Sequence, residues 1–157
     1  MEKTCDLKIV SHLRTDSRMS LTKISKNTGI PVSTIFEKMK RNAGNIIAKN
    51  TCLLNFSKLG MNTRAKIALR TIPDDRARLK EFLEKNKNLN SLFKINNGYD
   101  YMLDMVFENM KDLEDFLEEL EFNFKIKSKH VFYVIEEIAQ EKFLDSPLHY
   151  EIIKYGF

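Results

Sequence analysis

The chain has 157 residues, a mass of 18.4 kDa and a formal net charge of +4, with 43% hydrophobic and 31% charged residues. This composition can build a buried core as one domain or two small ones, and it excludes a disordered or collagen-like chain. The sequence offers neither the run of about 20 apolar residues that a membrane span needs nor a secretory signal, and two cysteines are too few for a disulfide framework, so we expect a cytoplasmic protein without a membrane partner.

Positive charge is concentrated in the first 60 residues. This part contains 11 Lys and Arg against 4 acidic residues, a net charge of +7, whereas the rest of the chain contains 15 against 18, a net charge of −3. The contrast predicts two units with different partners, of which the basic one suits a polyanion such as nucleic acid. Chance variation between small domains is the alternative explanation.

Two helices are predicted before residue 30. The first has an apolar face at helical spacing, formed by Leu7, Val10 and Leu13. Ser20 is a natural N-cap for the second, because its hydroxyl can accept a hydrogen bond from a free backbone N–H. This helix is short, since Thr28 is followed by Gly29, the residue that a left-handed C-terminal cap favours.

A third helix is predicted over residues 32–43. Pro31 suits its entrance because a first-turn residue needs no N–H donor, and Ile35 and Met39 form its buried i,i+4 pair. A short helix, a glycine turn and an amphipathic helix form the helix-turn-helix arrangement that places its last helix in the DNA major groove.

The candidate DNA-binding residues lie on the outside of this arrangement. Small hydroxyls early in the third helix would allow a close approach to base edges, and cations further along would reach phosphates. Phe36 would either touch a thymine methyl or pack within the fold. The predicted DNA-binding residues are Ser20, Pro31, Ser33, Thr34, Glu37, Lys38, Lys40, Arg41 and Lys49.

A small β-hairpin wing is predicted after the third helix. Residues 46–48 and 51–56 are short apolar stretches on either side of Lys49 and Asn50, which make a plausible turn. Lys49 would lie at the tip of the wing, near a phosphate or in solvent. We therefore expect a helix-turn-helix domain over residues 1–50 and a connecting strand or linker over residues 51–62.

The second half alternates strands and helices. Strands are predicted at residues 66–72, 89–96, 101–107 and 127–135 from period-two hydrophobicity and from the Asn96-Asn97-Gly98 turn signal. A helix begins at Pro73, and a second has the i, i+3, i+4, i+7 stripe of Leu113, Phe116, Leu117 and Leu120. The order βαββαβ predicts a ferredoxin-like sandwich over residues 63–140, followed by a tail at 141–157, and hence an α+β protein.

The predicted sheet needs a partner. Two helices can cover only one of its faces, while the other face also carries apolar side chains. Self-association is the economical solution, because a two-fold homodimer would also present two reading helices to two DNA half-sites.

The sequence resembles the leucine-responsive/AsnC family of transcription regulators, Lrp/AsnC. The similar segments, in matching order and spacing, are DLKIV at 6–10, DSRMS at 16–20, LTKIS at 21–25, GIPVSTI at 29–35, EKMKR at 37–41 and LG at 59–60. The resemblance implies a DNA-binding domain joined to a ligand-sensing and oligomerisation domain. It also implies dimers, often assembled into octamers, and an amino acid or related small molecule as effector.

The sequence departs from the family pattern at three places. Asn42 stands where the family has a leucine, and the segment before Ile46 is one residue shorter than usual. In the turn near the effector pocket of amino-acid-binding relatives, Asn97 replaces a glycine. The resemblance implies effector binding by Gly98, Tyr99 and Asp100, whereas a hairpin turn with nothing bound is the alternative.

Other functions are open at this point. An effector-free architectural DNA-binding protein would share the basic first half. An enzyme is the less favoured alternative, because His12, His130 and His149 are far apart in sequence and have no metal-ligand spacing. The sequence therefore predicts a regulator without a cofactor, a metal site or catalytic residues.

Overall fold

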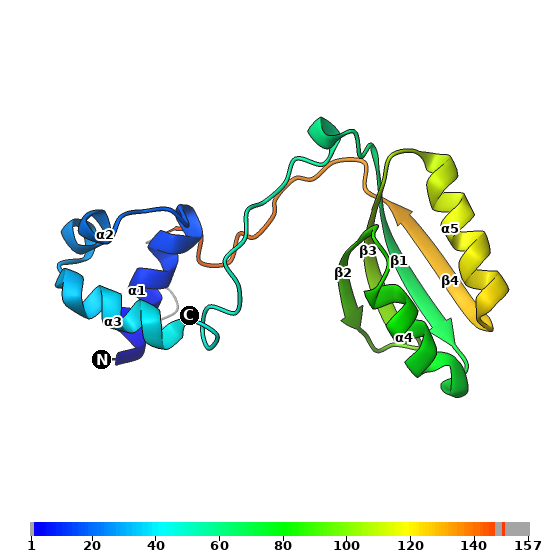
Figure 1. Ribbon diagram of the computed structural model, residues 1–157, viewed down its shortest axis with the longest axis horizontal. Coiled ribbons are helices and arrows are strands. Elements are labelled where there is room, and N and C mark those ends of the chain that lie inside the picture. Colours follow the sequence, from blue (N-terminus) through cyan, green and yellow to red (C-terminus); the bar gives the residue numbers. More distant parts are fainter. Residues whose placement is uncertain (1, 147–148, 150–157) are drawn as a thin grey trace. The chain divides into compact units, whose positions relative to one another are not determined.

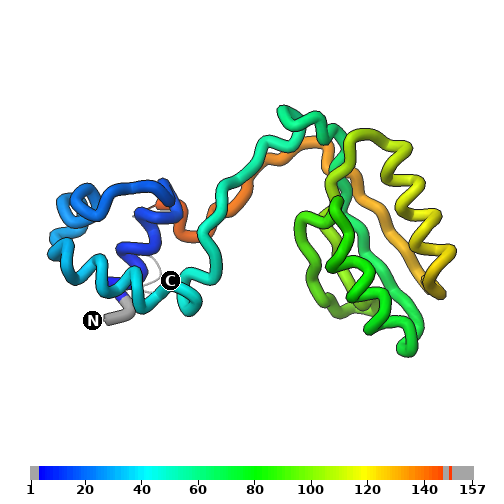
Figure 2. The backbone as a smooth tube through the Cα atoms, viewed as in Figure 1, coloured from blue at the N-terminus to red at the C-terminus, as the bar shows by residue number. Residues whose placement is uncertain are grey.

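The computed structural model describes residues 2–146 and 149, which form two compact units (Figure 1). The helical unit contains the residues up to Leu53 together with the described residues from Ile138 onward, and the sheet unit is Leu54–Glu137. Figure 2 traces the backbone out of the helical unit in green and back to it in orange. The predicted tail is therefore no separate part where it is described, and its Tyr150 and Tyr155 lie outside the described residues.

The helical unit contains three helices, as predicted: α1 at Glu2–Thr15, α2 at Leu21–Thr28 and α3 at Val32–Asn42. Its core is a fully buried isoleucine from each helix, Ile9, Ile24 and Ile35. The Ser20 hydroxyl accepts a hydrogen bond from the Lys23 amide at 3.3 Å and begins α2. Gly29, with φ of +71°, ends it in the left-handed conformation that favours glycine.

The predicted wing is wrong, because residues 46–56 form no β-hairpin. The chain turns back on the end of α3 instead: the amides of Asn45 and Ile47 both donate to the Asn42 carbonyl, at 3.1 and 2.9 Å. The Gly44 amide donates to the Ile47 carbonyl at 2.9 Å, which leaves a single bridge between Ala43 and Ile47. The free carbonyls of the helix end capture these amides, so they are not available for strand pairing.

The sheet unit has the predicted βαββαβ order. Its four strands lie in the order β2-β3-β1-β4, and each neighbouring pair is antiparallel. A one-turn helix at Pro73–Asp75 leads into α4, and another at Ser57–Leu59 precedes β1. The elements are β1 at Thr63–Thr71, α4 at Arg76–Glu84, β2 at Leu89–Lys94, β3 at Tyr101–Phe107, α5 at Met110–Asn123 and β4 at Ile126–Tyr133.

Both helices pack on one face of this sheet. Alternate side chains of β1 and β3, such as Ile67 and Leu103, are fully buried against Leu79 of α4 and Leu113 of α5. Because successive strand residues point to opposite faces, the remaining side chains lie on an outer face that neither helix covers. Phe93 of β2 and Phe132 of β4 are on this outer face, 53% and 56% exposed. No described helix is long and apolar enough to span a membrane.

Candidate nucleic-acid interface

The outward side of α3 carries polar side chains at its start and cations near its end. Ile35 faces the core and is fully buried, which fixes the rotation of the helix about its axis. Ser33, Glu37 and Lys40 are exposed, and all three belong to the stripe that the sequence placed outside. Phe36 lies beside them and is 59% exposed, which disfavours the alternative that it packs within the fold.

A buried charged cluster lies on the inner side of α3. The Lys38 ammonium donates to Asp6 Oδ1 of α1 at 3.0 Å, and the Asn42 amide donates to the same oxygen at 3.1 Å. Arg41 is exposed but brings its guanidinium within 3.9 Å of this oxygen. Burial by itself would raise the pKa of the Asp6 carboxyl, but the Asn42 and Lys38 hydrogen bonds and the charges of Lys38 and Arg41 outweigh it and lower the pKa.

This cluster corrects the prediction that Lys38 contacts DNA. Its side chain is only 11% exposed, and its ammonium is held by Asp6, so it does not face solvent. Positions 35, 38 and 42 follow the i, i+3, i+7 spacing of a buried stripe, which the polar character of Lys38 and Asn42 concealed. Asp6 precedes Ile9 by three residues on α1, so it occupies the matching stripe there. Asn42 thus occupies a core position and satisfies a buried carboxylate.

The other predicted DNA-binding residues differ in exposure. Ser20 is exposed but uses its hydroxyl as the N-cap of α2. Pro31 is the N-cap residue of α3 and its carbonyl accepts from the Ile35 amide at 3.0 Å. Thr34 is half-buried, and Lys49 is exposed in the loop after α3, which is not the tip of a hairpin.

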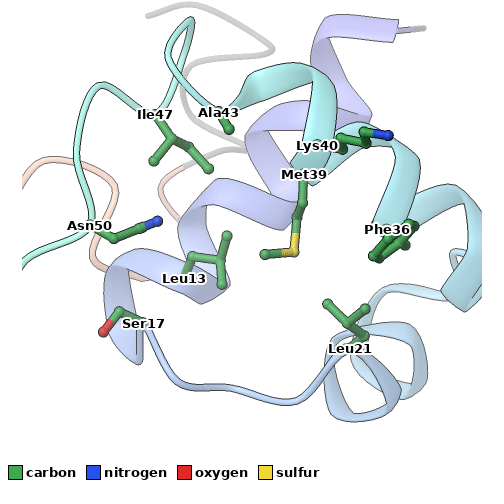
Figure 3. Close-up of a pocket in the computed structure, with 9 residues that line it drawn as sticks. All are labelled: Leu13, Ser17, Leu21, Phe36, Met39, Lys40, Ala43, Ile47 and Asn50. Atoms are coloured by element: carbon green, nitrogen blue, oxygen red, sulfur yellow. The ribbon is translucent and has the colours of Figure 1, made fainter.

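An apolar pocket of about 450 Å³ lies beside the outward side of α3. Figure 3 shows the Leu13 and Met39 side chains near its middle, Phe36 and Leu21 on one side, and Ile47 and Asn50 on the other. The turn after α3 therefore forms one wall of the pocket. Sequence analysis did not find this pocket, because its walls come from three helices and a loop that it expected to be a strand.

The predicted effector residues lie together in the turn between β2 and β3. Asn97 and Gly98 both have positive φ, 59° and 85°, as a tight hairpin turn requires. The Tyr99 hydroxyl lies 2.7 Å from Nδ1 of His130 on β4, with the two rings edge to face. The structure thus brings a second aromatic side chain, His130, to this turn, which the sequence analysis did not select.

Asp100 already has strong partners. Its Oδ1 forms an ion pair with Arg76, 2.8 Å from Nε, and its Oδ2 accepts a hydrogen bond from the Thr71 amide at 2.9 Å. The backbone amide of Asp100 also donates to the Leu69 carbonyl at 2.8 Å. Asp100 therefore fastens the turn to the end of β1, and both of its carboxylate oxygens are occupied.

Asp104 carries a buried charge on the outer face of the sheet. The sequence analysis did not identify it as the centre of a charged cluster. It receives two bonds from Arg64 at 2.9 and 2.7 Å, one from Lys66 at 2.9 Å and one from Asn90 at 2.7 Å. Burial would raise the pKa of this carboxyl, but these donors lower it from 3.8 to about 2. Arg64 also pairs with Glu137 and stacks on Phe56, so one guanidinium joins the residues before β1 to those after β4.

Comparison with known proteins points to one family. The Lrp/AsnC ligand binding domain matches residues 64–143, about half of the chain and nearly all of the βαββαβ order. The chain belongs to the Lrp/AsnC family. HTH-type transcriptional regulator FL11 of Pyrococcus furiosus is 30% identical over 114 residues, which cover 72% of this chain and 76% of that protein. LrpC of Bacillus subtilis is 24% identical over 113 residues, covering 71% and 78%.

Solved structures of the family share the fold. Transcriptional regulator NMB0573 of Neisseria meningitidis, in complex with L-Met, has a TM-score of 0.80 at 20% identity, covering 89% of this chain and 93% of that one. The structure of B. subtilis LrpC has a TM-score of 0.77 at 21% identity, covering 85% and 94%. By its family match and its 30% identical relative the chain is an Lrp/AsnC-type transcriptional regulator. The solved structures show the fold, a helix-turn-helix unit and a ferredoxin-like unit.

Proposed function

We propose that this regulator binds double-stranded DNA through the outward side of α3. The observation that carries the proposal is the rotation of this helix: Ile35 is locked in the core while Ser33, Glu37 and Lys40 are exposed. A small hydroxyl near the helix start allows a close approach to base edges, and Lys40 near its end can reach a phosphate. The net charge of +7 in the first 60 residues supports a polyanionic partner.

The remaining contacts come from the residues around this helix. Ser20 and Pro31 lie at the starts of α2 and α3, where backbone N–H groups can meet phosphates, and Thr34, Arg41 and Lys49 would add contacts at the edges. Lys38 is left out, because Asp6 holds its ammonium.

Salt dependence of binding tests the proposal. We expect the protein to bind a labelled duplex from its own upstream region, with log K falling linearly against log salt at a slope of about −0.9 per phosphate contact. Lys40→Ala should reduce this slope by about one. Lys111→Ala is the matched control, because it removes the same charge from an exposed position of α5, and it should leave the slope unchanged. Absence of binding at low salt would refute the proposal.

We further propose that the chain acts as a homodimer joined through the outer face of the sheet. Phe93 and Phe132 are exposed there although large apolar side chains favour burial. A two-fold dimer would supply two copies of α3 for two half-sites. Light scattering at increasing concentration should give twice the chain mass or a multiple of it, up to the octamer that the family resemblance implies. A constant mass of 18.4 kDa at all concentrations would exclude both the dimer and the octamer.

An amino acid is the proposed effector, bound near the turn of Gly98, Tyr99 and Asp100. The family match and the L-Met complex of a protein with the same fold support this class of ligand. Because Asp100 already binds Arg76 and Thr71, we assign it the role of holding the turn and look to the turn backbone for ligand contacts. Thermal shift against the twenty amino acids tests this, and a flat response would favour an effector-free regulator.

The alternative functions have distinct outcomes. A footprint without a preferred site would favour an architectural protein that coats DNA. We infer that the chain is not an enzyme, since its relatives bear the names of transcriptional regulators, and we assign it to the cytoplasm, where its proposed DNA partner is accessible. A coloured cofactor or a turnover activity in the purified protein would contradict this inference.

A further inference from the structure

Residues 138–146 return to the helical unit after the sheet unit is complete. The backbone therefore joins the two units twice, near residues 53 and 138. We call residues 138–146 the return strap. Its Leu144 is 5% exposed, whereas the neighbouring Phe143 is 72% exposed, so one specific side chain of the strap is anchored.

Arg14, in the last turn of α1, holds the strap with all three nitrogens of its guanidinium. Nε donates to the Phe143 carbonyl at 3.0 Å, one terminal nitrogen donates to the Glu141 carboxylate at 2.9 Å, and the other donates to the Glu141 carbonyl at 2.6 Å. The planar fork of arginine makes this pattern possible, and lysine cannot reproduce it. Two of the three bonds go to backbone carbonyls, so Arg14 recognises the path of the strap as well as its charge.

Thr15 adds a contact at the point where α1 ends. Its hydroxyl donates to the Asp145 carbonyl at 2.8 Å. The strap has left-handed backbone at two non-glycine residues, Glu141 with φ of 53° and Leu144 with φ of 59°. Such conformations are uncommon and persist where surrounding contacts impose them, which agrees with the fork of bonds from Arg14 and with the burial of Leu144.

The docked end of α1 leads directly into the turn before α2. This turn is tight: the Asp16 amide donates to the His12 carbonyl and the Met19 amide donates to the Asp16 carbonyl, both at 3.0 Å. Ser20 follows at once as the N-cap of α2, and α2 packs on α3 through Ile24. A shift of the end of α1 would therefore move the start of α2 and the base on which α3 rests.

We propose that the return strap sets the geometry of the helix-turn-helix for DNA binding, with Arg14 as a positioning residue. The inference rests on the proposed DNA-binding function. Release of the strap lets the unit leave its binding-competent arrangement, and the measured affinity falls in proportion to the competent fraction. The match to the Lrp/AsnC ligand-binding domain ends at residue 143, within the strap. The strap therefore lies where the chain leaves the sheet unit and enters the helical unit.

Two matched pairs of variants in the full chain test the proposal. Leu144→Ser removes the buried anchor without a charge change, and Phe143→Ser alters the exposed neighbour in the same way. Arg14→Lys keeps the charge but loses the fork, and Arg18→Lys is its exposed control. If release leaves about one tenth of the molecules competent, Leu144→Ser and Arg14→Lys weaken DNA binding about tenfold at fixed salt. The salt slope stays constant, because the phosphate contacts themselves are unchanged.

Glu141→Ala separates positioning from simple electrostatics. This change raises the net charge by one, so electrostatics alone predicts tighter DNA binding, whereas loss of a strap contact predicts weaker binding. Hydrogen exchange gives a readout without DNA: amides of residues 15–20 should exchange faster in Leu144→Ser, while that of Ile35 stays protected. If amides throughout the helical unit lose protection in Leu144→Ser, that variant is unfolded. Arg14→Lys and Glu141→Ala then test the strap proposal.

The outcomes distinguish the two proposals. If the unaltered protein binds no DNA at low salt, the proposed function fails, and hydrogen exchange still reports whether the strap is docked. If it binds DNA and both variants of each pair behave alike, the strap proposal is overturned while the DNA-binding function stands. Tighter binding by Glu141→Ala would also overturn the strap proposal.

Discussion

Replacing Lys38 is the sharpest test of how α3 is oriented. In Lys38→Met the Asp6 carboxylate stays buried and keeps, within the described part of the chain, the Asn42 amide at 3.1 Å and the more distant Arg41 guanidinium at 3.9 Å. Breaking one partner of a buried ion pair costs roughly 3–5 kcal/mol, and the side chains of Asp6 and Lys38 are 10% and 11% exposed, so we expect about 3 kcal/mol. A unit of this size has a total stability of roughly 3–10 kcal/mol.

The assay is urea unfolding monitored by hydrogen exchange on peptides of α1 and α3. This readout reports the helical unit separately from the sheet unit. At a urea dependence of about 1 kcal/mol per molar, the midpoint should fall by about 3 M or the unit should be unfolded at the start. Lys40→Met removes the same charge from the exposed side of α3 and should change the unfolding free energy by less than about 0.5 kcal/mol. The double variant Asp6→Asn with Lys38→Met should recover most of the loss, because neither charge remains buried.

For DNA affinity the order of the two lysines is reversed: replacing Lys40 should matter more than replacing Lys38. The double variant should keep its affinity once folded, whereas Lys40→Met should lose affinity and salt dependence. The orientation of α3 would be refuted if Lys38→Met unfolded at the same urea concentration as Lys40→Met. It would also be refuted if Lys38→Met remained fully folded but no longer bound DNA.

Three further predictions concern the sheet unit. The pKa of Asp104 is about 2 in the folded state, against an ordinary value of 3.8. Its contribution of about 2 kcal/mol to the free energy of unfolding should therefore be present at pH 5 and lost as the pH falls from about 4 to 2. Urea midpoints across this range should drop in the natural protein and stay flatter in Asp104→Asn. Gly98→Ala should cost about 1 kcal/mol in thermal unfolding because φ at this position is +85°, although no atom lies within 4 Å of the added methyl group, and Gly60→Ala, with φ of +81° and equal space, should match it. Phe132→Glu on the exposed outer face should leave the unit folded by circular dichroism but convert the proposed dimer to a monomer in light scattering, and an unchanged mass would place the dimer contact elsewhere.

Much of the exposed side of α3 could be predicted because it depends on local rules. Ile35 fixes one side of the helix by its periodicity, and Ser33, Glu37 and Lys40 then lie outside. Lys38 was misplaced because its burial depends on Asp6, 32 residues earlier, which supplies the charge that makes a lysine acceptable in the core. No local pattern contains this information, although the i, i+3, i+7 spacing with Ile35 and Asn42 indicates a buried position.

The wing failed for a related reason. Residues 46–48 and 51–56 have strand-like hydrophobicity, but the Asn42 carbonyl at the end of α3 accepts hydrogen bonds from the amides of Asn45 and Ile47, which are then not available for strand pairing. The Asp104 cluster was also missed: alternation places Asp104 correctly on the outer face, yet the donors that bury it come from β1 and from Asn90. Strand register, which brings Arg64 and Lys66 beside β3, decides this contact.

The sequence alone determined the three helices of the first unit and the βαββαβ order of the second, because period, caps and turn residues act over a few positions, and the resemblance of its segments indicated the family. Ser20 and Gly29 mark the start and the end of α2, and Asn97 and Gly98 supply the positive φ angles of the hairpin turn. Only the tertiary structure decided which charges are buried and where residues 138–146 pack. Arg14 and Phe143 are separated by 129 positions, so no local pattern in the sequence links them.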